Sequence, residues 1–242
     1  TISNQWSKHQ ITNFDYIMFL NTICGRTYNN LSQYFIFPWI IKDFFDSLSI
    51  SSNSIYRDLT YPIFAQDEER RDTVINKYEM KESDNKYHCG TFYSTHAFVS
   101  YYLLRQCPYS EIALEIQGGH FDGADRLFNS TTQMSSMDER FQELIPELYY
   151  LPELFVNTNE YVFGYTQKRK KVSDVELPQW SQNDPRLFVL IHKKIFEHKI
   201  VSENLNKWID LIFGYRQQGP AAVEVCNTYR QACYPIDNKK LY

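Results

Sequence analysis

The chain has 242 residues, with 25 Lys and Arg against 29 Asp and Glu, and a formal net charge of −4. This acidic balance argues against nucleic acid as the main partner, because domains that bind phosphate backbones carry a basic excess. A chain of this length buries roughly 70–75% of the surface that its unfolded form exposes, so it can hold one core without disulfides. No apolar run approaches the ~20 residues of a membrane-spanning helix, so we expect any membrane association to be peripheral.

The five cysteines lack the pattern of a disulfide framework or a metal site. Their number is odd, and no two of them have Cys-x-x-Cys spacing. We therefore expect reduced thiols that pack as small apolar residues in a cytoplasmic protein, with no metal and no cofactor. They are Cys24, Cys89, Cys107, Cys226 and Cys233.

The first half of the chain alternates between helical and irregular patterns. Apolar residues that include Trp6, Ile17 and Leu20 form a stripe at helical spacing and predict a helix over about 3–23. From about 28 to 61, Asn, Ser, Pro and aromatic residues follow one another without a clean period, which predicts irregular backbone. Further helices are predicted over 68–78, as a short exposed helix, and over 94–105 and 122–130.

The second half begins with a polar loop and ends in predicted helices. Asp184-Pro185 is typical of an N-cap followed by the first helical residue. Trp208, Leu211 and Ile212 share one helix face. The predicted helices cover about 184–198, 202–214 and 220–232. The pattern as a whole predicts a mainly α fold with an irregular, aromatic middle.

Seven segments occur in a distinctive order along the chain: LNTICGRTYNNLSQYFIFPWII from Leu20, YRDLTYPI from Tyr56, HCGTFYSTHAFVSYYLLR from His88, GHFDGADRLF from Gly119, ELIPELYYLPELFVN from Glu143, VELPQW from Val175 and WIDLIFGYRQQGPAAVE from Trp208. In content and order they resemble the BEACH domain, the module of the Beige and Chediak–Higashi family of large membrane-trafficking scaffolds.

The resemblance implies a fold, a context and a function. The fold is mainly α, with helices packed around a core of partly extended, irregular segments, and residues 1–242 form a single BEACH domain. The context is a larger cytosolic protein with a PH-like domain upstream and WD40 repeats downstream. The function is non-enzymatic scaffolding in vesicle trafficking, membrane fusion or fission and the size of lysosome-related organelles, with peripheral placement on endosomal, lysosomal or other vesicle membranes.

An irregular buried core sets a requirement on its polar side chains. Its backbone N–H and C=O groups must still find partners, so side chains that reach several groups are needed inside. Polar residues within the densest apolar motifs are our candidates for such structural clips. They are Asn21, Arg26, Asp58, Asp122, Asp125, Arg126 and Asp210. We expect Asp210 to be ion-paired, because no other charge lies in its apolar run.

The upstream PH-like neighbour that the resemblance implies needs a docking surface on this chain. His9-Gln10 stands where the family commonly has Arg-Glu, and Asn30 where Asp is usual, so the surface of this chain departs from the family pattern there. The candidates lie in the predicted first helix and in the irregular stretch after it. They are His9, Gln10, Asn13, Tyr28, Asn30 and Tyr34. Further partners are expected to be trafficking proteins.

A hydrolase is the competing hypothesis. His88 and Cys89 would serve as base and nucleophile, or Asp122 and Asp125 as paired carboxylates. The interpretation that we favour is structural: His88 and Cys89 pack at the start of a helix, and Asp125 pairs with an arginine. Convergence of these groups in one water-accessible pocket would favour the enzyme, whereas burial in separate polar clusters would favour the scaffold.

A basic run in the polar loop supports a third hypothesis, a peripheral lipid-binding module. Lys168, Arg169, Lys170 and Lys171 are consecutive. A basic residue near an anionic leaflet contributes about 1 kcal/mol of attraction. Four charges in a loop are also common as a solvated surface, so both interpretations stay open here.

Overall fold

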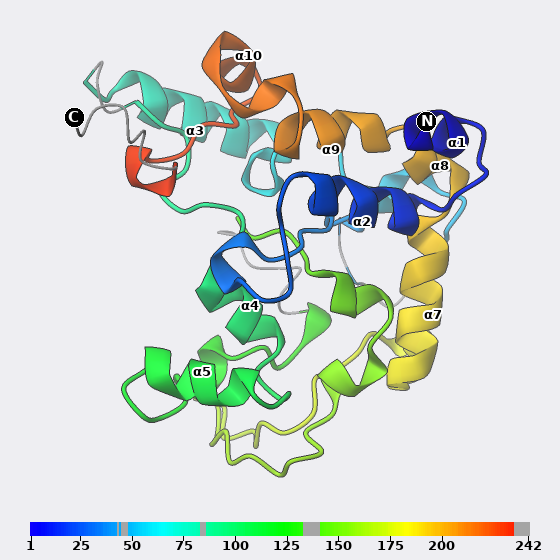
Figure 1. The fold of residues 1–242 in the computed structure, drawn as a ribbon. Coiled ribbons are helices and arrows are strands. Elements are labelled where there is room, and N and C mark those ends of the chain that lie inside the picture. The colour runs from blue at the N-terminus through cyan, green and yellow to red at the C-terminus, as the bar shows by residue number, and fades with distance from the viewer. Residues whose placement is uncertain (43, 45–47, 83–85, 133–140, 235–242) are drawn as a thin grey trace. The chain divides into compact units, whose positions relative to one another are not determined.

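The computed structural model describes residues 1–42, 44, 48–82, 86–132 and 141–234 (Figure 1). The chain divides into two compact units, here named unit 1 and unit 2. Unit 1 comprises Thr1–Arg57, Ser94–Asp138 and Glu143–Ser202, and unit 2 comprises Asp58–Tyr93, Glu139–Gln142 and Glu203–Tyr242. The described residues form helices, 3-10 turns and isolated β-bridges without a β-sheet, which confirms the predicted mainly α class.

Unit 1 combines short helices with an extended, buried segment. Its helices are α1 (Ile2–Ser7), α2 (Asn13–Ile23), α4 (His96–Tyr102), α5 (Tyr109–Ile116), α7 (Pro185–Phe196) and α8 (Lys199–Ser202). Its 3-10 turns are η1 (Leu31–Gln33), η2 (Asn53–Ile55), η5 (Ala124–Arg126), η6 (Pro146–Tyr149), η7 (Pro152–Phe155) and η8 (Gln179–Ser181). Residues 34–41 are all buried, and single bridges join Phe37 to Leu144 and Ile41 to Tyr56. This segment is the irregular core that the sequence predicts.

Helix α7 supplies one apolar face of unit 1. Asp184 caps it by accepting hydrogen bonds from the backbone N–H groups of the first turn, as the sequence predicts. Phe188, His192 and Phe196 recur every four residues, so they share one face of the helix, and all three are fully buried. Tyr149 of η6 stacks on His192 with ring centroids 4.3 Å apart and packs against Phe196 at 4.9 Å. This face therefore ties α7 to the η6 turn.

Unit 2 is built from short helices around a second aromatic cluster. Its elements are η3 (Ile63–Ala65), α3 (Glu68–Glu79), α9 (Leu205–Ile212), η9 (Tyr215–Gln217), α10 (Gly219–Glu224) and η10 (Gln231–Cys233). Tyr229 is buried and contacts the rings of Phe64, Phe92 and Tyr93. Helix α3 has no buried residue, so the predicted short exposed helix is confirmed.

The predicted helix over 3–23 is wrong in one respect, because the structure contains two helices there. Helix α1 ends before a turn in which His9 has a positive φ of 54°. Thr12 then caps α2 by accepting from the N–H of Asp15. A β-region Thr with a hydroxyl acceptor is a strong N-cap, and this local preference outweighs the apolar stripe that runs through both helices.

The other helical predictions differ from the structure mainly in length. The predicted helix over 122–130 is only the η5 turn, because the Asp122 carboxylate accepts from Gly123 N–H and from Arg126 instead of letting an α-helix continue. The predicted helix over 202–214 is α8 followed by α9, and Asn204 rather than Ser202 precedes α9. The helix predicted from 220 already ends at Glu224. Helix α5 was not predicted.

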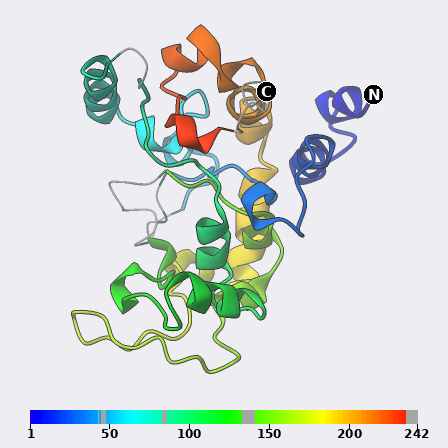
Figure 2. The same ribbon diagram turned by 60° about the vertical axis from the view of Figure 1, so that its left-hand side comes forward.

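Figure 2 shows the same ribbon turned by 60° about the vertical axis. Within the part of the chain that the structure describes, no helix has both the length and the apolar character needed to cross a bilayer.

Candidate functional site

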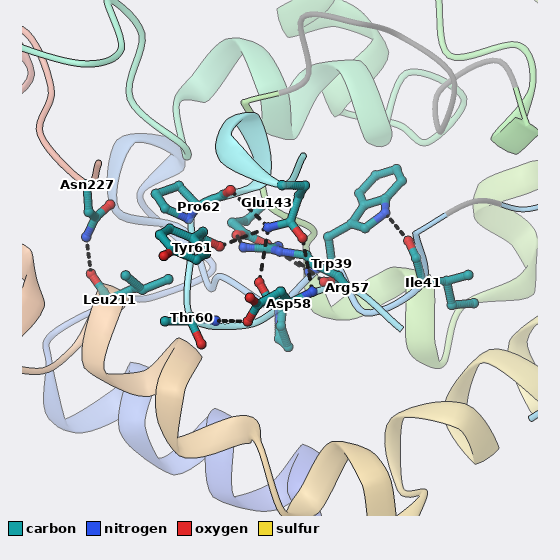
Figure 3. Close-up of polar contacts among 12 residues, drawn as sticks. Trp39, Ile41, Arg57, Asp58, Thr60, Tyr61, Pro62, Glu143, Leu211 and Asn227 are labelled. Atoms are coloured by element: carbon teal, nitrogen blue, oxygen red, sulfur yellow. Dashed lines mark hydrogen bonds and ion pairs between the residues drawn. The ribbon is translucent and has the colours of Figure 1, made fainter. Parts of the chain in front are cut away.

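A buried ion pair forms the polar centre of unit 1 (Figure 3). Arg57 Nη2 lies 2.7 Å from Glu143 Oε1, and Arg57 Nη1 donates to Glu143 Oε2 at 2.8 Å. The same two groups hold the extended segment, because Trp39 N–H donates to Glu143 Oε2 at 2.8 Å and Trp39 C=O accepts from Arg57 Nη1 at 3.2 Å. Both side chains are almost fully buried. The pair thus satisfies backbone groups that have no sheet or helix partner.

Asn21 performs a related task between α2 and the extended segment. Its amide donates to Ile17 C=O and Ile36 C=O, each at 2.9 Å, and its oxygen accepts from Ile36 N–H at 2.9 Å. The side chain is fully buried. Arg26 acts nearby, where its Nη1 donates to Tyr34 C=O at 2.9 Å. The structure therefore places two of the predicted clips on irregular core backbone.

Unit 2 contains a comparable amide at Asn227. Its Nδ2 donates to Leu211 C=O at 2.9 Å and to Arg216 C=O at 2.8 Å, as Figure 3 shows for Leu211. Its oxygen accepts from the hydroxyl of Tyr229 at 3.0 Å. These contacts close the end of α9 against the chain that follows α10. The sequence does not single out Asn227, because this residue stands outside the apolar motifs.

Asp58 does not clip buried backbone as predicted. It is exposed, and its Oδ1 accepts from Thr60 N–H at 2.9 Å in a local turn. Gln66 takes the bridging role in this segment. Its amide donates to the carbonyls of Asp58, Tyr61 and Pro62 at 3.0–3.1 Å. A long amide side chain can span three carbonyls of one loop, which a short carboxylate cannot do because it has no donor when ionised.

The predicted clips Asp122, Asp125 and Arg126 lie nearer the surface than expected. Arg126 pairs with Asp122, not with Asp125, and three quarters of the arginine side chain is exposed. The guanidinium hydrogen bond lowers the pKa of the Asp122 carboxyl. Asp125 accepts instead from Gln167 N–H at 2.9 Å. Gln167 N–H is therefore one partner of Asp125, and Arg126 is the partner of Asp122.

Asp210 also departs from its prediction. The side chain is half-buried in α9, but no ion-pair partner for it is found among the described residues. Its Oδ1 and Cα lie against the backbone of Gly214, where a Cβ would come within 2.8 Å of Asp210 Cα. A residue without a Cβ is therefore required at position 214 after α9.

Several buried polar residues were missed by the sequence analysis. Arg105 is fully buried and donates to the carbonyls of Ser173 and Phe128. Burial lowers the pKa of Arg105 to about 10, so the group stays protonated at neutral pH. The signal for Arg105 in the sequence is a charged residue directly after the apolar run Tyr101–Leu104, a pattern that is also typical of the polar end of a helix. Arg57 and Glu143 stand in the recognised motifs but were not singled out.

A cluster of tyrosines covers a buried glutamate at the surface of unit 1. Tyr34 OH donates to Glu147 Oε1 at 2.6 Å, and Tyr150 OH donates to the same oxygen at 3.4 Å. Tyr28 OH lies 3.5 Å from Tyr150 OH. Burial raises the pKa of the Glu147 carboxyl. Tyr28 and Tyr150 are partly exposed, whereas Tyr34 and Glu147 are buried. Tyr28, Tyr34 and Tyr150, here called the tyrosine cluster, therefore present aromatic surface to solvent next to a buried acid.

The predicted docking residues divide into exposed and buried groups. His9, Gln10 and Asn30 are exposed, and Tyr28 is partly exposed. Asn13 and Tyr34 are only 2% and 1% exposed, so they cannot form the rim of a surface. Asn13 instead accepts from the Trp6 indole N–H at 2.8 Å and donates to Phe196 C=O at 2.7 Å. Both residues follow largely exposed stretches of sequence, and only the fold shows that their side chains point into the interior.

His88 and Cys89 lie side by side in unit 2 without forming a nucleophile–base pair. His88 Nδ1 is 2.7 Å from Thr228 Oγ1, and its ring stacks on Tyr78 with centroids 4.2 Å apart. Burial lowers the pKa of His88 to about 4, so the ring is neutral at pH 7. The Cys89 thiol donates to Thr91 C=O at 3.3 Å, and burial raises its pKa. A protonated thiol is a weak nucleophile.

The carboxylates of the hydrolase hypothesis belong to a different part of the chain. Asp122 and Asp125 are in unit 1, whereas His88 and Cys89 are in unit 2. Among the residues that the structure describes, no group of three or more His, Cys, Asp and Glu side chains is placed to hold a metal ion.

The basic run lies at the tip of a hairpin over residues 161–172, here called the basic hairpin. Thr166 N–H donates to Lys170 C=O at 2.9 Å, and Val172 N–H donates to Gly164 C=O at 3.0 Å. Lys168, Arg169, Lys170 and Lys171 are all exposed. Lys170 forms an ion pair with Glu176. The four basic residues therefore lie close together at the tip of one hairpin.

The comparisons with known proteins agree on one family. The Beige/BEACH domain matches residues 4–241. The chain is 42% identical to WD repeat- and FYVE domain-containing protein 4 of Mus musculus, over 97% of this chain and 8% of that protein. It is 41% identical to Beige protein homolog 1 of Saccharomyces cerevisiae, over 97% of this chain and 11% of that protein. It is 43% identical to a putative neurobeachin homolog of Caenorhabditis elegans, over 95% of this chain and 9% of that protein.

Proposed function

Because this chain belongs to the Beige/BEACH domain family, we propose that it is a non-enzymatic protein-interaction module of a larger scaffold protein in vesicle trafficking. The chain spans about a tenth of the length of the relatives described above, and one of them is named for WD repeats and a FYVE domain. This supports flanking domains, which we propose to be a PH-like domain upstream and WD40 repeats downstream. The work of the whole protein would be membrane fusion or fission and control of the size of lysosome-related organelles, on the cytoplasmic face of endosomal, lysosomal or other vesicle membranes.

The state of His88 and Cys89 supports a role without catalysis. A Cys nucleophile needs a lowered thiol pKa and a base within reach, but burial raises the pKa of Cys89 and lowers that of His88. Both groups bond to neighbouring backbone or hydroxyl groups instead. A neutral imidazole and a protonated thiol with these partners are typical of residues that pack within a fold.

The tyrosine cluster is the observation that carries the interaction role. Tyr28 and Tyr150 keep 38% and 43% of their surface exposed. Phe14 lies beside them, with its ring centroid 6.1 Å from that of Tyr150. Tyrosine gives protein interfaces a large apolar area together with a polar edge, at a low cost in side-chain entropy. We propose that the upstream PH-like domain docks here and on the exposed turn at His9 and Gln10.

Amide hydrogen exchange tests this docking. A longer piece of the protein that includes the upstream segment is compared with the 242-residue chain. We expect slower exchange at His9, Gln10, Tyr28 and Asn30 in the longer piece, together with a higher melting temperature. Unchanged exchange at all four positions would contradict a joint surface.

Two sets of variants separate the surface role from catalysis. Tyr28→Ser should abolish the added exchange protection, whereas Tyr215→Ser, which changes an equally aromatic but separate exposed position, should not. Cys89→Ser and His88→Ala should keep cellular function if the protein stays folded. A hydrolytic activity of the purified protein that these two variants lose would favour the enzyme hypothesis instead.

A further inference from the structure

The basic hairpin carries both buried and exposed apolar side chains. Phe163 and Val172 join a buried cluster with Leu104, Ala124 and Leu127. Val162 and Tyr165 are 82% and 67% exposed. An aliphatic and an aromatic side chain are thus exposed to solvent on a hairpin that is itself anchored to a buried cluster.

The tip of this hairpin is basic and fixed in shape. Lys168, Arg169 and Lys171 form no ion pair with any described residue, while the charge of Lys170 is offset by Glu176. Arg169 has a φ of 61° and donates its N–H to Thr166 C=O at 2.8 Å, which sets the turn. The bond from Gln167 N–H to Asp125 then ties the tip to η5.

Two acidic groups that contact this region accept backbone hydrogen bonds and form no ion pair with these three cations. Asp174, at the base of the hairpin, accepts from Asn157 N–H at 2.7 Å, and Asp125 is engaged with Gln167. The chain as a whole is acidic, with a net charge of −4, so the basic hairpin is a local exception. An anionic surface would attract this tip although the chain as a whole carries a net negative charge. In the ribbon views the hairpin is the yellow-green segment at the lower edge (Figures 1 and 2).

We infer that the basic hairpin is a contact site for an anionic lipid bilayer, a role that goes beyond the proposed protein-docking function. The three cations would lie among the lipid phosphates, where electrostatic attraction acts over a Debye length of about 8 Å. Tyr165 has the amphipathic ring that favours the headgroup region, and Val162 would enter the acyl boundary. An acidic protein segment would also pair with the cations, and the vesicle experiment below separates it from a bilayer.

Vesicle flotation of the full-length protein tests the charged part of this site. The probes are phosphatidylcholine vesicles with and without phosphatidylserine. The variant Lys168→Ser/Arg169→Ser/Lys171→Ser should lower partitioning onto the anionic vesicles by roughly a hundredfold, since each cation contributes about 1 kcal/mol and 1.4 kcal/mol is tenfold. The control removes three exposed lysines elsewhere, as Lys8→Ser/Lys77→Ser/Lys194→Ser, and should bind like the wild type.

A second pair of variants tests the apolar part. Val162→Ser/Tyr165→Ser should weaken binding at every salt concentration, because it leaves the charges in place. Leu190→Ser/Tyr215→Ser removes two side chains that are similarly exposed and should have no effect. Each variant must keep the melting temperature of the wild type.

Three outcomes would overturn the inference. In the first, the hairpin charge variant binds anionic vesicles as the wild type does. In the second, the two charge variants lose binding equally, so that only net charge matters. In the third, the hairpin variant keeps vesicle binding but is lost from membranes in cells, which would identify an acidic protein as the occupant. Exchange protection of the tyrosine cluster is a separate readout, so the docking proposal stands or falls independently.

Discussion

Removing one half of the Arg57–Glu143 ion pair should severely destabilise unit 1. The pair is bidentate, with contacts of 2.7 and 2.8 Å, and both side chains are excluded from solvent. Arg57→Met leaves Glu143 charged and buried, which costs about 3–5 kcal/mol. Glu143→Met leaves the guanidinium in the same position and also orphans Trp39 N–H. Either loss is a large share of a total stability of about 5–15 kcal/mol.

A double-mutant cycle isolates the pair itself. Arg57→Met/Glu143→Met removes both charges and fills a similar volume, so it should cost less than the sum of the single variants by at least about 1 kcal/mol. The single variants should lower the melting temperature by roughly 6–20 °C, at about 2–4 °C per kcal/mol for a chain of this size. Urea unfolding followed by tryptophan fluorescence measures the free energies, and circular dichroism should give the same transition.

The exposed Asp122–Arg126 pair provides the matched control. Asp122→Asn removes one partner of an ion pair whose arginine is mostly solvated, and water can replace the lost contact. Its free energy of unfolding should stay close to that of the wild type. The reasoning fails if the single variants at Arg57 and Glu143 each cost less than about 1 kcal/mol, or if their effects simply add.

Three further predictions concern other parts of the fold. Asn21→Leu should cost about 2–6 kcal/mol in urea unfolding, because it orphans both backbone groups of Ile36, and a loss below about 1 kcal/mol would show that water replaces the amide. Burial lowers the pKa of His192 to about 4, below its ordinary value near 6.5, so the unfolded state binds a proton first and stability should fall as the pH drops from about 6.5 to 4. Between pH 7 and 4.5, the free energy of unfolding should fall by about 2–3 kcal/mol less in His192→Phe than in the wild type. An equal dependence of this free energy on pH in wild type and variant would show that His192 does not contribute. Gly214→Ala should destabilise the chain by about 1–3 kcal/mol, because its Cβ would lie 2.8 Å from Asp210 Cα, and a melting temperature equal to that of the wild type would refute the close approach.

Local sequence signals predicted the structure correctly where that structure depends only on residues of the same segment. Asp184-Pro185 predicted the start of α7 because a cap and a fixed φ act within one turn. The polar composition of α3 predicted its exposure. The order of the motifs predicted the family, which the comparisons confirm. The α1–α2 break was missed because the apolar stripe continues through both helices, while the Thr12 cap depends on a single side chain.

The polar core could not be read in the same way. Arg57 and Glu143 are 86 positions apart, and Asn21 meets Ile36 across a change from helix to extended chain. A sequence shows that a charge lies among apolar residues, but it does not show which distant group will compensate that charge. Composition alone therefore favoured Asp58 and Asp210 as much as Asn21.

The sequence by itself determined the mainly α class, the irregular middle of the chain and the presence of a basic run, because each depends on neighbouring residues. Only the tertiary structure decided that Tyr34 and Asn13 are buried, that Glu143 neutralises Arg57, and that Lys168 to Lys171 share one hairpin with the exposed side chains of Val162 and Tyr165. The physical reason is that burial and charge pairing depend on which segments meet in space. In a core without a regular sheet, no repeating hydrogen-bond pattern fixes those meetings in advance.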